Sequence, residues 1–368
     1  MRLSVSRTLT IDGRMLKTGI GAYSLNLIRE LHDSYGWHPH AVTHPDYQSL
    51  LTPYCERVAT TRARMYSLQE QISVPLAASG APVLHVPHFN APLLYRGSLL
   101  ITIHDLTHLL FPAYRAQWKS RLYAAPMLSA AARQAEHIFT VSEYSKSKII
   151  ETLGVAEDKI TVTYNGVSEL FCPGDRREAR ATVAARFGQH APYLLFVGSP
   201  KPHKNLDALL AAYASLFRDR QQQCGLVIVG SDAAGTHRIR TAAENLAISP
   251  LFIENATNPE VVQLYRAAEL SVLPSFEEGF GLPILESMAC DTPVLSSTAA
   301  SLPEIAGDAA LYFDPNRPEE LAAQIDRVLS SSDLQLKMRH DGLARAASFS
   351  WKEMARRHIE VYERYCNA

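Results

Sequence analysis

The feature that most constrains the fold of this sequence is a regular alternation of short apolar runs with longer helical patterns. Runs rich in Val, Ile, Leu and Phe end in polar or glycine residues, and segments with helical periodicity follow them. This alternation is typical of parallel sheets whose strands are joined by helices. We predict strands at residues 9–12, 40–43, 83–86, 99–104, 137–141 and 160–163, then at 193–197, 225–229, 251–253, 270–273, 293–296 and 311–313, with helices such as 206–218 between them.

The length of the chain predicts more than one domain. Its 368 residues exceed one ordinary core, and 47% apolar with 20% charged residues is the composition of a well-packed globular protein. The strand rhythm is interrupted at residues 171–183, where a Pro-Gly pair precedes a run of charges. We therefore expect an α/β fold with two doubly wound parallel-sheet domains, residues 1–172 and 173–349, followed by an amphipathic helix over residues 350–368.

Charge, cysteines and hydropathy exclude several classes of protein. The formal net charge is −1, so no overall field favours nucleic acid. The five cysteines are scattered and form no C-x-x-C pair, so neither a disulfide framework nor a zinc site is indicated. The sequence contains no Asp-x-Asp pair, and we predict no metal site. It has no leader pattern and no apolar run of roughly 18 residues, and we expect a cytoplasmic protein that does not span a membrane.

Polar segments at predicted strand ends are the candidate binding residues, because ligands of open parallel sheets bind at the carboxyl ends of the strands. The most informative segment is EGFGLPILE, residues 278–286. Gly279, Gly281 and Pro283 argue against one continuous helix, so we expect Glu278 in a glycine loop and Glu286 in the first turns of a helix. Two readings remain: the two carboxylates hold one ligand at two points, or Glu278 is solvated and Glu286 only complements the helix dipole.

Two glutamates separated by seven residues that include Gly-Phe-Gly, followed by SMACDTPVL, resemble the family 4 retaining glycosyltransferases of the GT-B fold. Within that family the sequence is similar to bacterial mannosyltransferases of polysaccharide and O-antigen assembly. The resemblance implies two Rossmann-like domains that face a cleft, with a C-terminal helix that crosses back to the first domain. It also implies that Glu278 contacts the donor sugar and that Glu286 binds the nucleotide ribose. The amides that would approach sugar and phosphate are those of Gly279, Phe280, Gly281 and Leu282.

The segment GSPKPHKNL, residues 198–206, follows a strand and begins a helix. A lysine at a helix start opposes the dipole, which favours an anionic partner for Lys204, and the family has a basic pair beside the diphosphate at this place. Here His203 stands where relatives have arginine, and Ser199 follows the glycine. His203 is either a pH-dependent phosphate donor or a surface residue. We assign Ser199, His203 and Lys204 to the donor site.

The first half supplies further candidates. Gly19 and Gly21 are expected in the turn after the first strand, and the resemblance places this glycine loop near the donor diphosphate. His104 ends a strand and by itself is either a satisfied core residue or a catalytic one. In the family the histidine of an H-D-L segment lies beside the donor sugar, so His104 is our catalytic candidate with Glu278. Ser142 and Asn165 either line the cleft or serve as cap and turn residues.

The resemblance implies transfer of a hexose from a nucleotide diphosphate sugar to a saccharide or lipid-linked saccharide, without metal and without any other cofactor. We expect GDP-mannose as the donor and a mannosyltransferase as the enzyme. The alternatives are a glycosyltransferase that uses UDP-sugars and a nucleotide-sugar 2-epimerase, which shares the fold. Residues 114–134 mix basic and aromatic side chains, which is either a solvated helix face or a peripheral contact with anionic membrane at the inner face of the cytoplasmic membrane.

Overall fold

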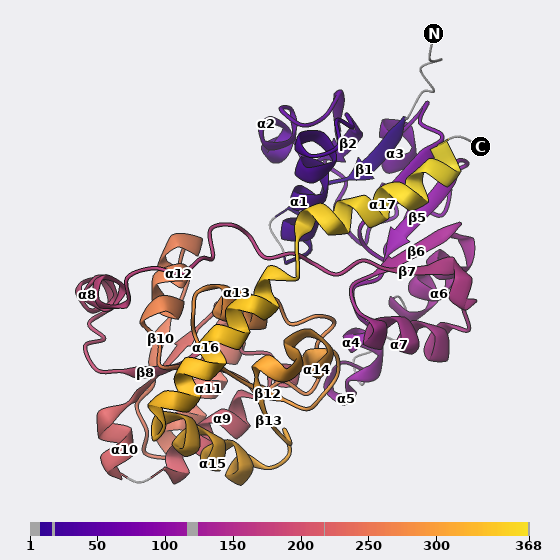
Figure 1. Ribbon diagram of the computed structural model, residues 1–368. Helices are drawn as coiled ribbons and strands as arrows, with labels where there is room; N and C mark the ends of the chain where they lie inside the picture. Colours follow the sequence, from indigo (N-terminus) through magenta and orange to yellow (C-terminus); the bar gives the residue numbers. More distant parts are fainter. Residues whose placement is uncertain (1–7, 17–18, 116–123, 217, 367–368) are drawn as a thin grey trace. The chain divides into compact units, whose positions relative to one another are not determined.

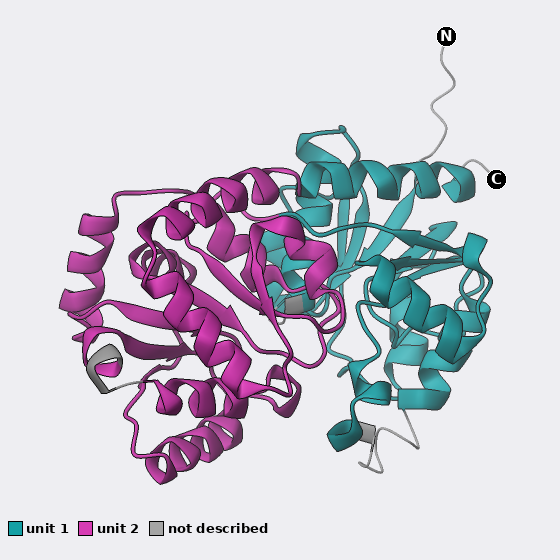
Figure 2. Cartoon of the chain, turned by 60° about the horizontal axis from the view of Figure 1, so that its bottom comes forward, with its two compact units in different colours: residues 1–166, 350–368 teal, residues 167–349 magenta. Residues whose placement is uncertain are grey.

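The computed structural model describes residues 8–16, 19–115, 124–216 and 218–366. The chain forms two compact units (Figure 2). Unit 1 consists of Met1–Gly166 and Ser350–Ala368, and unit 2 of Val167–Phe349. The C-terminal segment therefore belongs to the first unit, as the family resemblance implies.

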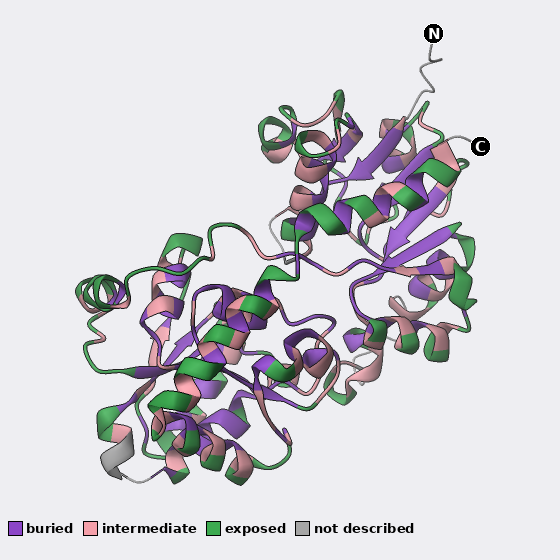
Figure 3. Ribbon diagram, in the orientation of Figure 1, coloured by how far each residue is buried: buried purple, intermediate pink, exposed green. Residues whose placement is uncertain are grey.

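The core of unit 1 is a parallel sheet (Figure 1), and its strands follow the order β3-β2-β1-β4-β5-β6-β7. Its central strands are buried along their whole length, while the helices alternate between buried and exposed residues (Figure 3). Apolar runs without alternation are what two covered sheet faces require. The strands are β1 (Leu9–Asp12), β2 (His40–Thr43), β3 (Arg57–Thr60), β4 (Val83–Val86), β5 (Ser98–Thr102), β6 (His137–Thr140) and β7 (Ile160–Val162).

Helices of unit 1 connect most successive strands, whereas β4 and β5 are joined by a loop, and α1 packs against the C-terminal helix α17. The helices are α1 (Gly19–Asp33), α2 (Gln48–Leu51), α3 (Glu70–Ala77), α4 (Thr107–Leu110), α5 (Pro112–Arg115), α6 (Ala125–Gln134), α7 (Glu143–Leu153) and α17 (Trp351–Cys366), with short 3₁₀ turns η1 (Pro45–Tyr47) and η3 (Glu157–Lys159).

A buried chain of hydrogen bonds fastens α17 to unit 1. His358 Nδ1 lies 2.8 Å from the carbonyl oxygen of Met354, so Nδ1 must donate and Nε2 accepts from the Tyr23 hydroxyl at 2.7 Å. Tyr23 also lies 3.1 Å from the Thr102 hydroxyl, which contacts His85 Nε2 at 2.8 Å. The other ring nitrogen of His85 lies 2.6 Å from the Tyr362 hydroxyl, back on α17.

Unit 2 contains a second parallel sheet, in the order β10-β9-β8-β11-β12-β13. Its strands are β8 (Tyr193–Val197), β9 (Gly225–Val229), β10 (Leu251–Ile253), β11 (Leu270–Leu273), β12 (Val294–Ser297) and β13 (Leu311–Phe313). Its helices are α8 (Arg176–Phe187), α9 (Leu206–Ser215), α10 (Arg218–Gln223), α11 (Ala233–Asn245), α12 (Asn258–Ala267), α13 (Leu282–Ala289), α14 (Leu302–Ala306), α15 (Pro318–Leu329) and α16 (Ser332–Ala347), with 3₁₀ turns η4 (Pro202–Lys204) and η5 (Gly307–Ala309).

Three local expectations differ from the structure. Strand β3 was not predicted, because its RVAT sequence lies at the sheet edge with exposed ends and shows no apolar run. The helix expected over residues 206–218 ends at Ser215, where Leu216 takes up an extended conformation. Residues 171–183, expected at the domain join, include the start of α8, which buries Ala179 and Val183 on one face; the chain enters unit 2 earlier, after Gly166.

Within the described residues, no helix combines the length and the apolar character that crossing a bilayer requires. Much of the basic and aromatic segment 114–134 falls on residues 116–123, which lie outside the described part of the chain.

Candidate active site

The predicted donor residues lie at the point in the unit 2 sheet where the strand order reverses. From β8 the chain builds outward through β9 and β10, then returns to place β11 on the other side of β8. The chain therefore leaves β8 toward β9 and leaves β11 toward β12, in opposite directions along the sheet. The carboxyl ends of β8 and β11 border the crevice where such sheets bind ligands. The loops that follow the two strands, residues 198–205 and 274–281, contain the GSPKPHKN and PSFEEGFG segments.

Backbone and amide hydrogen bonds tie these two loops together. The N–H of Phe276 donates to the carbonyl of His203 at 2.8 Å. Asn205, which has a left-handed backbone with φ of 54°, donates its side-chain amide to the carbonyls of Pro274 at 3.0 Å and Pro315 at 2.8 Å. Asparagine is among the few residues that tolerate this backbone conformation. The preceding residue, Lys204, is thereby held facing the loop of the neighbouring strand.

Lys204 and Glu278 form an ion pair at the centre of this arrangement. The ammonium lies 2.5 Å from Glu278 Oε1, and the hydroxyl of Ser275 donates to the same oxygen at 2.8 Å. The two side chains are 17% and 11% exposed, so they are shielded but not sealed from solvent. Ser301 donates to the backbone carbonyl of Glu278 at 2.9 Å. Two residues predicted separately for phosphate and for sugar are thus brought into contact, and Ser275 and Ser301 were not predicted.

The glycine segment, residues 279–282, offers backbone groups to a ligand rather than side chains. Gly281 has φ of 95° and caps α13, where an added side chain would come within 2.7 Å of Leu302. The ring of Phe280 is buried edge-on against Phe349, with centroids 5.9 Å apart. Only the main chain of Phe280 is therefore available to a ligand. Leu282 begins the helix, as the proline that follows it predicts.

Glu286 lies on α13 and accepts a hydrogen bond from the Tyr265 hydroxyl at 3.2 Å. Burial raises the pKa of Glu286 to about 7, against which the hydrogen bond from Tyr265 acts only weakly. Nothing in the described surroundings pairs this carboxylate with a cation. A half-buried acid without a counter-ion costs stability, and ribose hydroxyls are donors that would satisfy it.

The loop after β8 lies close to the backbone at Gly230, which follows β9. Gly198 has φ of 152°, and a side chain at Gly230 would come within 2.0 Å of the Gly198 carbonyl. Ser199 follows, half-buried, with its carbonyl accepting the N–H of Lys201 at 2.8 Å. Glycine is required at these positions because two backbones meet.

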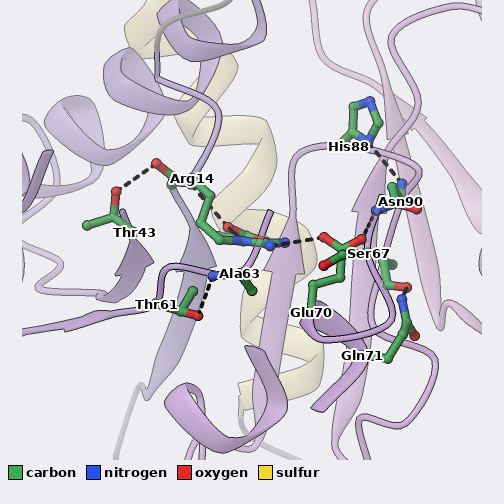
Figure 4. A network of polar contacts seen from close by, with 12 residues as sticks. Arg14, Thr43, Thr61, Ala63, Ser67, Glu70, Gln71, His88 and Asn90 are labelled. Carbon is green, nitrogen blue, oxygen red and sulfur yellow. Dashed lines mark hydrogen bonds and ion pairs between the residues drawn. The ribbon is translucent and has the colours of Figure 1, made fainter. Parts of the chain in front are cut away.

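The corresponding reversal point of the unit 1 sheet, between β1 and β4, carries a buried charged network that the sequence analysis missed (Figure 4). Arg14 donates to both oxygens of Asp12, at 2.7 to 3.0 Å, and to Glu70 at 2.9 Å. The side chain of Asn90 donates to the other Glu70 oxygen. The N–H of Asn90 donates to His88 Nδ1 at 3.0 Å.

The energetics of this network favour a functional role. Burial raises the pKa of Glu70, although Arg14 and Asn90 act in the opposite direction. A buried ion pair contributes little net stability, because desolvation offsets the attraction. Its place at the carboxyl edge of β1 and β4 is that of a binding site. The signal was available, since DGR begins at the last residue of one predicted strand and HFN follows another.

His104 follows β5 and is held by three contacts. Its Nε2 lies 3.1 Å from the carbonyl of Pro87 and must carry the proton, which leaves Nδ1 as an acceptor. The ring meets the edge of Tyr23 at a centroid distance of 4.8 Å, and Ser145 donates to the His104 carbonyl at 3.1 Å. Burial lowers the pKa of His104, so the imidazole is neutral at physiological pH. A fixed neutral imidazole is suited to accept a hydrogen bond from a hydroxyl.

The remaining first-half candidates have different surroundings. Gly19 and Gly21 lie in the first turn of α1 and not in the turn before it, so that prediction was wrong. A side chain at Gly21 would come within 2.2 Å of the Leu16 carbonyl, which explains the glycine sterically. Ser142 caps α7 by accepting the N–H of Ser145. Asn165 is buried, and its Oδ1 has no hydrogen-bond partner among the described residues.

No group of three His, Cys, Asp or Glu side chains with the arrangement of a metal site occurs in the part of the chain that the structure describes.

Comparison with known families matches both halves of the chain. Residues 17–170 match the family described as Glycosyltransferase Family 4, and residues 181–345 match the family described as Glycosyl transferases group 1. The chain belongs to glycosyltransferase family 4. This glycosyltransferase is 30% identical over 285 residues to an O-antigen chain mannosyltransferase B of Escherichia coli, covering 76% of this chain and 74% of that protein. It is 28% identical to a serotype-specific mannosyltransferase of the same species, of which it spans 35%.

Solved structures share the GT-B fold. A sucrose-phosphate synthase from Thermosynechococcus elongatus matches with a TM-score of 0.80 and 21% identity, covering 97% of this chain and 98% of that one. The Anabaena protein HepE, solved in complex with UDP-glucose, matches with a TM-score of 0.79 and 17% identity, covering 97% and 99%. At these identities the likeness establishes the fold alone.

Proposed function

We propose that this glycosyltransferase is a retaining, metal-independent mannosyltransferase that uses GDP-mannose and acts on a saccharide or lipid-linked saccharide. We further propose that it works in the cytoplasm with peripheral contact to an anionic membrane. The observation that carries the proposal is the Lys204–Glu278 pair beside a glycine loop at the reversal point of the unit 2 sheet. The E. coli mannosyltransferase relative supports mannose as the sugar.

In this proposal unit 2 binds the donor. The Lys204 ammonium and the amides of residues 279–282 stabilise the diphosphate as it leaves, which supplies positive charge without a metal. Glu278 accepts hydrogen bonds from the sugar, and Glu286 accepts them from the ribose. An ammonium carries three N–H groups and a carboxylate two oxygens, so the pair retains capacity for a ligand.

Unit 1 contributes His104 and the acceptor residues. His104 Nδ1 accepts a hydrogen bond from a donor-sugar hydroxyl. The bond between the sugar C1 and the phosphate oxygen breaks with its electron pair leaving on the nucleoside diphosphate. The acceptor hydroxyl then bonds C1 on the same face through an oxocarbenium-like state, and its proton passes to the departing phosphate.

The donor is tested by thermal shift with GDP, UDP and ADP, followed by product analysis with their sugars, because a ligand that binds only the native state raises its stability. We expect a response to GDP and transfer from GDP-mannose. A response to UDP alone would replace GDP-mannose with the alternative donor class, for which the HepE complex with UDP-glucose is the supporting observation. The two family matches favour transfer over 2-epimerisation, and release of a free epimerised nucleotide sugar would contradict transfer.

The role of Glu278 is tested by Glu278→Gln, which keeps the shape and removes the charge. We expect transfer to fall by about 10²–10³-fold, the size of effect seen when one transition-state hydrogen-bonding group is lost. Glu244→Gln, on the exposed face of α11, is the matched control and should retain full activity. Full activity of a folded Glu278→Gln variant would remove Glu278 from the mechanism.

A further inference from the structure

The polarity of helix α3 is inverted relative to an ordinary surface helix. A surface helix normally buries apolar side chains and exposes charged ones. In α3 the inward face carries Glu70, which is fully buried and paired with Arg14, together with Val74. The outward face carries Ile72 and Leu76, which are 60% and 68% exposed.

Neighbouring residues extend this outward face. Leu68, in the helical turn that leads into α3, is 87% exposed and lies four residues before Ile72, so Leu68, Ile72 and Leu76 share one side of the helix. Gln71 accepts the N–H of Leu93 at 2.8 Å, which holds the next segment alongside α3. Leu94 in that segment is 63% exposed. We call Leu68, Ile72, Leu76 and Leu94 the α3 surface.

The exposed charges of the segment that leads into α3 are basic. Arg62 and Arg64 precede the helix and are exposed, and neither forms an ion pair within the described residues. Glu70 is the acidic residue of segment 61–78, and it points inward. Segment 61–78 therefore exposes long aliphatic side chains and two arginines, and it carries no exposed acid among its described residues.

We infer that the α3 surface is where the enzyme lies against an anionic lipid bilayer. The inference rests on the peripheral contact proposed above, and it places that contact at α3 instead of at residues 114–134. A face that joins aliphatic side chains to arginines matches the boundary between acyl chains and anionic headgroups. A second copy of the chain fits less well, since one short helix buries little area compared with a stable dimer and would bring like charges together.

The opposite face of α3 relates this membrane contact to the proposed reaction. The inward face of the same helix holds Glu70 in the network at the carboxyl edge of β1 and β4. One helix would thus face the bilayer on one side and the buried polar network of Arg14, Glu70 and Asn90 on the other. This is the arrangement that an acceptor with a polar head and a lipid tail requires.

The test is vesicle flotation of the full chain with neutral phosphatidylcholine and with vesicles that contain an anionic phospholipid. We expect recovery with anionic vesicles, an approximately tenfold or greater loss of partitioning for the triple variant Leu68→Ser/Ile72→Ser/Leu76→Ser, and about a fivefold loss for each arginine changed in Arg62→Gln/Arg64→Gln. Raising the salt concentration should reduce binding of the wild type more than of the arginine variant.

Matched controls come from the same chain. Leu336→Ser removes an exposed leucine of α16, and Arg177→Gln/Arg327→Gln removes two exposed arginines elsewhere. These controls should float as the wild type does, and all variants should keep donor binding measured by thermal shift. Equal flotation of the triple variant and Leu336→Ser would overturn the inference. Concentration-dependent dimerisation that the triple variant abolishes would overturn it in favour of a second copy. Because flotation needs no turnover, its outcome is independent of the donor and of catalysis.

Discussion

The contact between Lys204 and Glu278 sets two partly buried charges against one another at the edge of the unit 2 sheet. Removing the lysine leaves the carboxylate with Ser275 as its remaining described side-chain partner. An uncompensated shielded charge destabilises more than loss of the whole pair does. The pair therefore contributes to the stability of unit 2 as well as to ligand binding.

We expect Lys204→Met to destabilise unit 2 by about 1–3 kcal/mol, the cost of leaving a buried polar group unsatisfied. The double variant Lys204→Met/Glu278→Met should recover most of that loss, while neither variant transfers sugar. Urea denaturation of wild type, both single variants and the double variant provides the measurement. Additive losses would show that the two side chains are not coupled in the folded protein.

We expect the ionised Glu286 side chain to lower the stability of the fold and to strengthen ligand binding. Its pKa is raised to about 7 from an ordinary 4.5, so the folded state holds the proton more tightly than the unfolded chain. The stability contributed by this group is complete below pH 4.5 and is lost as the pH rises through 7. Glu286→Gln should therefore be more thermostable than wild type at pH 8, with little difference at pH 4.5.

The same variant should bind nucleoside diphosphate more weakly at pH 8, because an amide is a poorer partner for ribose hydroxyls than a carboxylate. Wild-type affinity should fall as the pH falls through about 7, and the affinity of Glu286→Gln should not. Melting curves and nucleotide titrations across pH 4.5–8 measure both. A variant with wild-type affinity at pH 8 would remove Glu286 from the ribose site.

At the scale of elements, α17 is joined to unit 1 through a histidine that burial keeps neutral. Burial lowers the pKa of His358 from 6.5 to about 3, so the unfolded chain takes up a proton at a pH where the folded protein does not. The contribution of His358 is complete above pH 6.5 and is lost as the pH falls toward 3.

We expect His358→Leu to cost about 1–3 kcal/mol at pH 7.5, because the Tyr23 hydroxyl loses its acceptor in the core. The difference from wild type should shrink by pH 5, where the wild type has begun to lose this contribution and the variant has nothing there to titrate. Chemical denaturation at the two pH values measures the difference. A constant difference would show that His358 does not titrate between the two states.

The sequence predicted most elements because the buried strands of a parallel sheet appear as uninterrupted apolar runs, as LTID and YLLFV do. It missed β3, whose partners are backbone groups at a sheet edge and whose side chains need not be apolar. The E-x7-E and GSPKPHKN segments were found because their glycines and charges are contiguous in sequence. Arg14, Glu70 and Asn90 were missed because each is an ordinary polar residue alone and only the fold brings them together.

For the whole molecule, the buried histidines of unit 1 and Glu286 of unit 2 should shift stability with pH in opposite directions, with Glu70 of unit 1 acting against the histidines of its own unit. Unit 1 buries several histidines whose pKa values burial lowers, so it loses stability as the pH falls below 6.5. In unit 2 the raised pKa of Glu286 acts in the other direction. The histidines of unit 1 are His85, His88, His104, His137 and His358.

We expect acidification from pH 7.5 to 5 to open unit 1 before unit 2. Hydrogen exchange followed by mass spectrometry resolves the two sets of peptides, and protection should fall first in β4, β5 and α17. Earlier loss of protection in α9 and α13 would contradict the assignment of these shifts to folding stability.

Unit 1 is discontinuous in sequence, since α17 returns to it after the whole of unit 2. During synthesis, β1 to β7 therefore emerge from the ribosome long before the helix that supplies His358 and Tyr362 to their core. Unit 2 is one continuous stretch of sequence, and all of its residues are made before α17. Until the last helix is made, the sheet of the first half lacks the part of its cover that α17 supplies beside α1, and a nascent-chain-binding chaperone would find its substrate there.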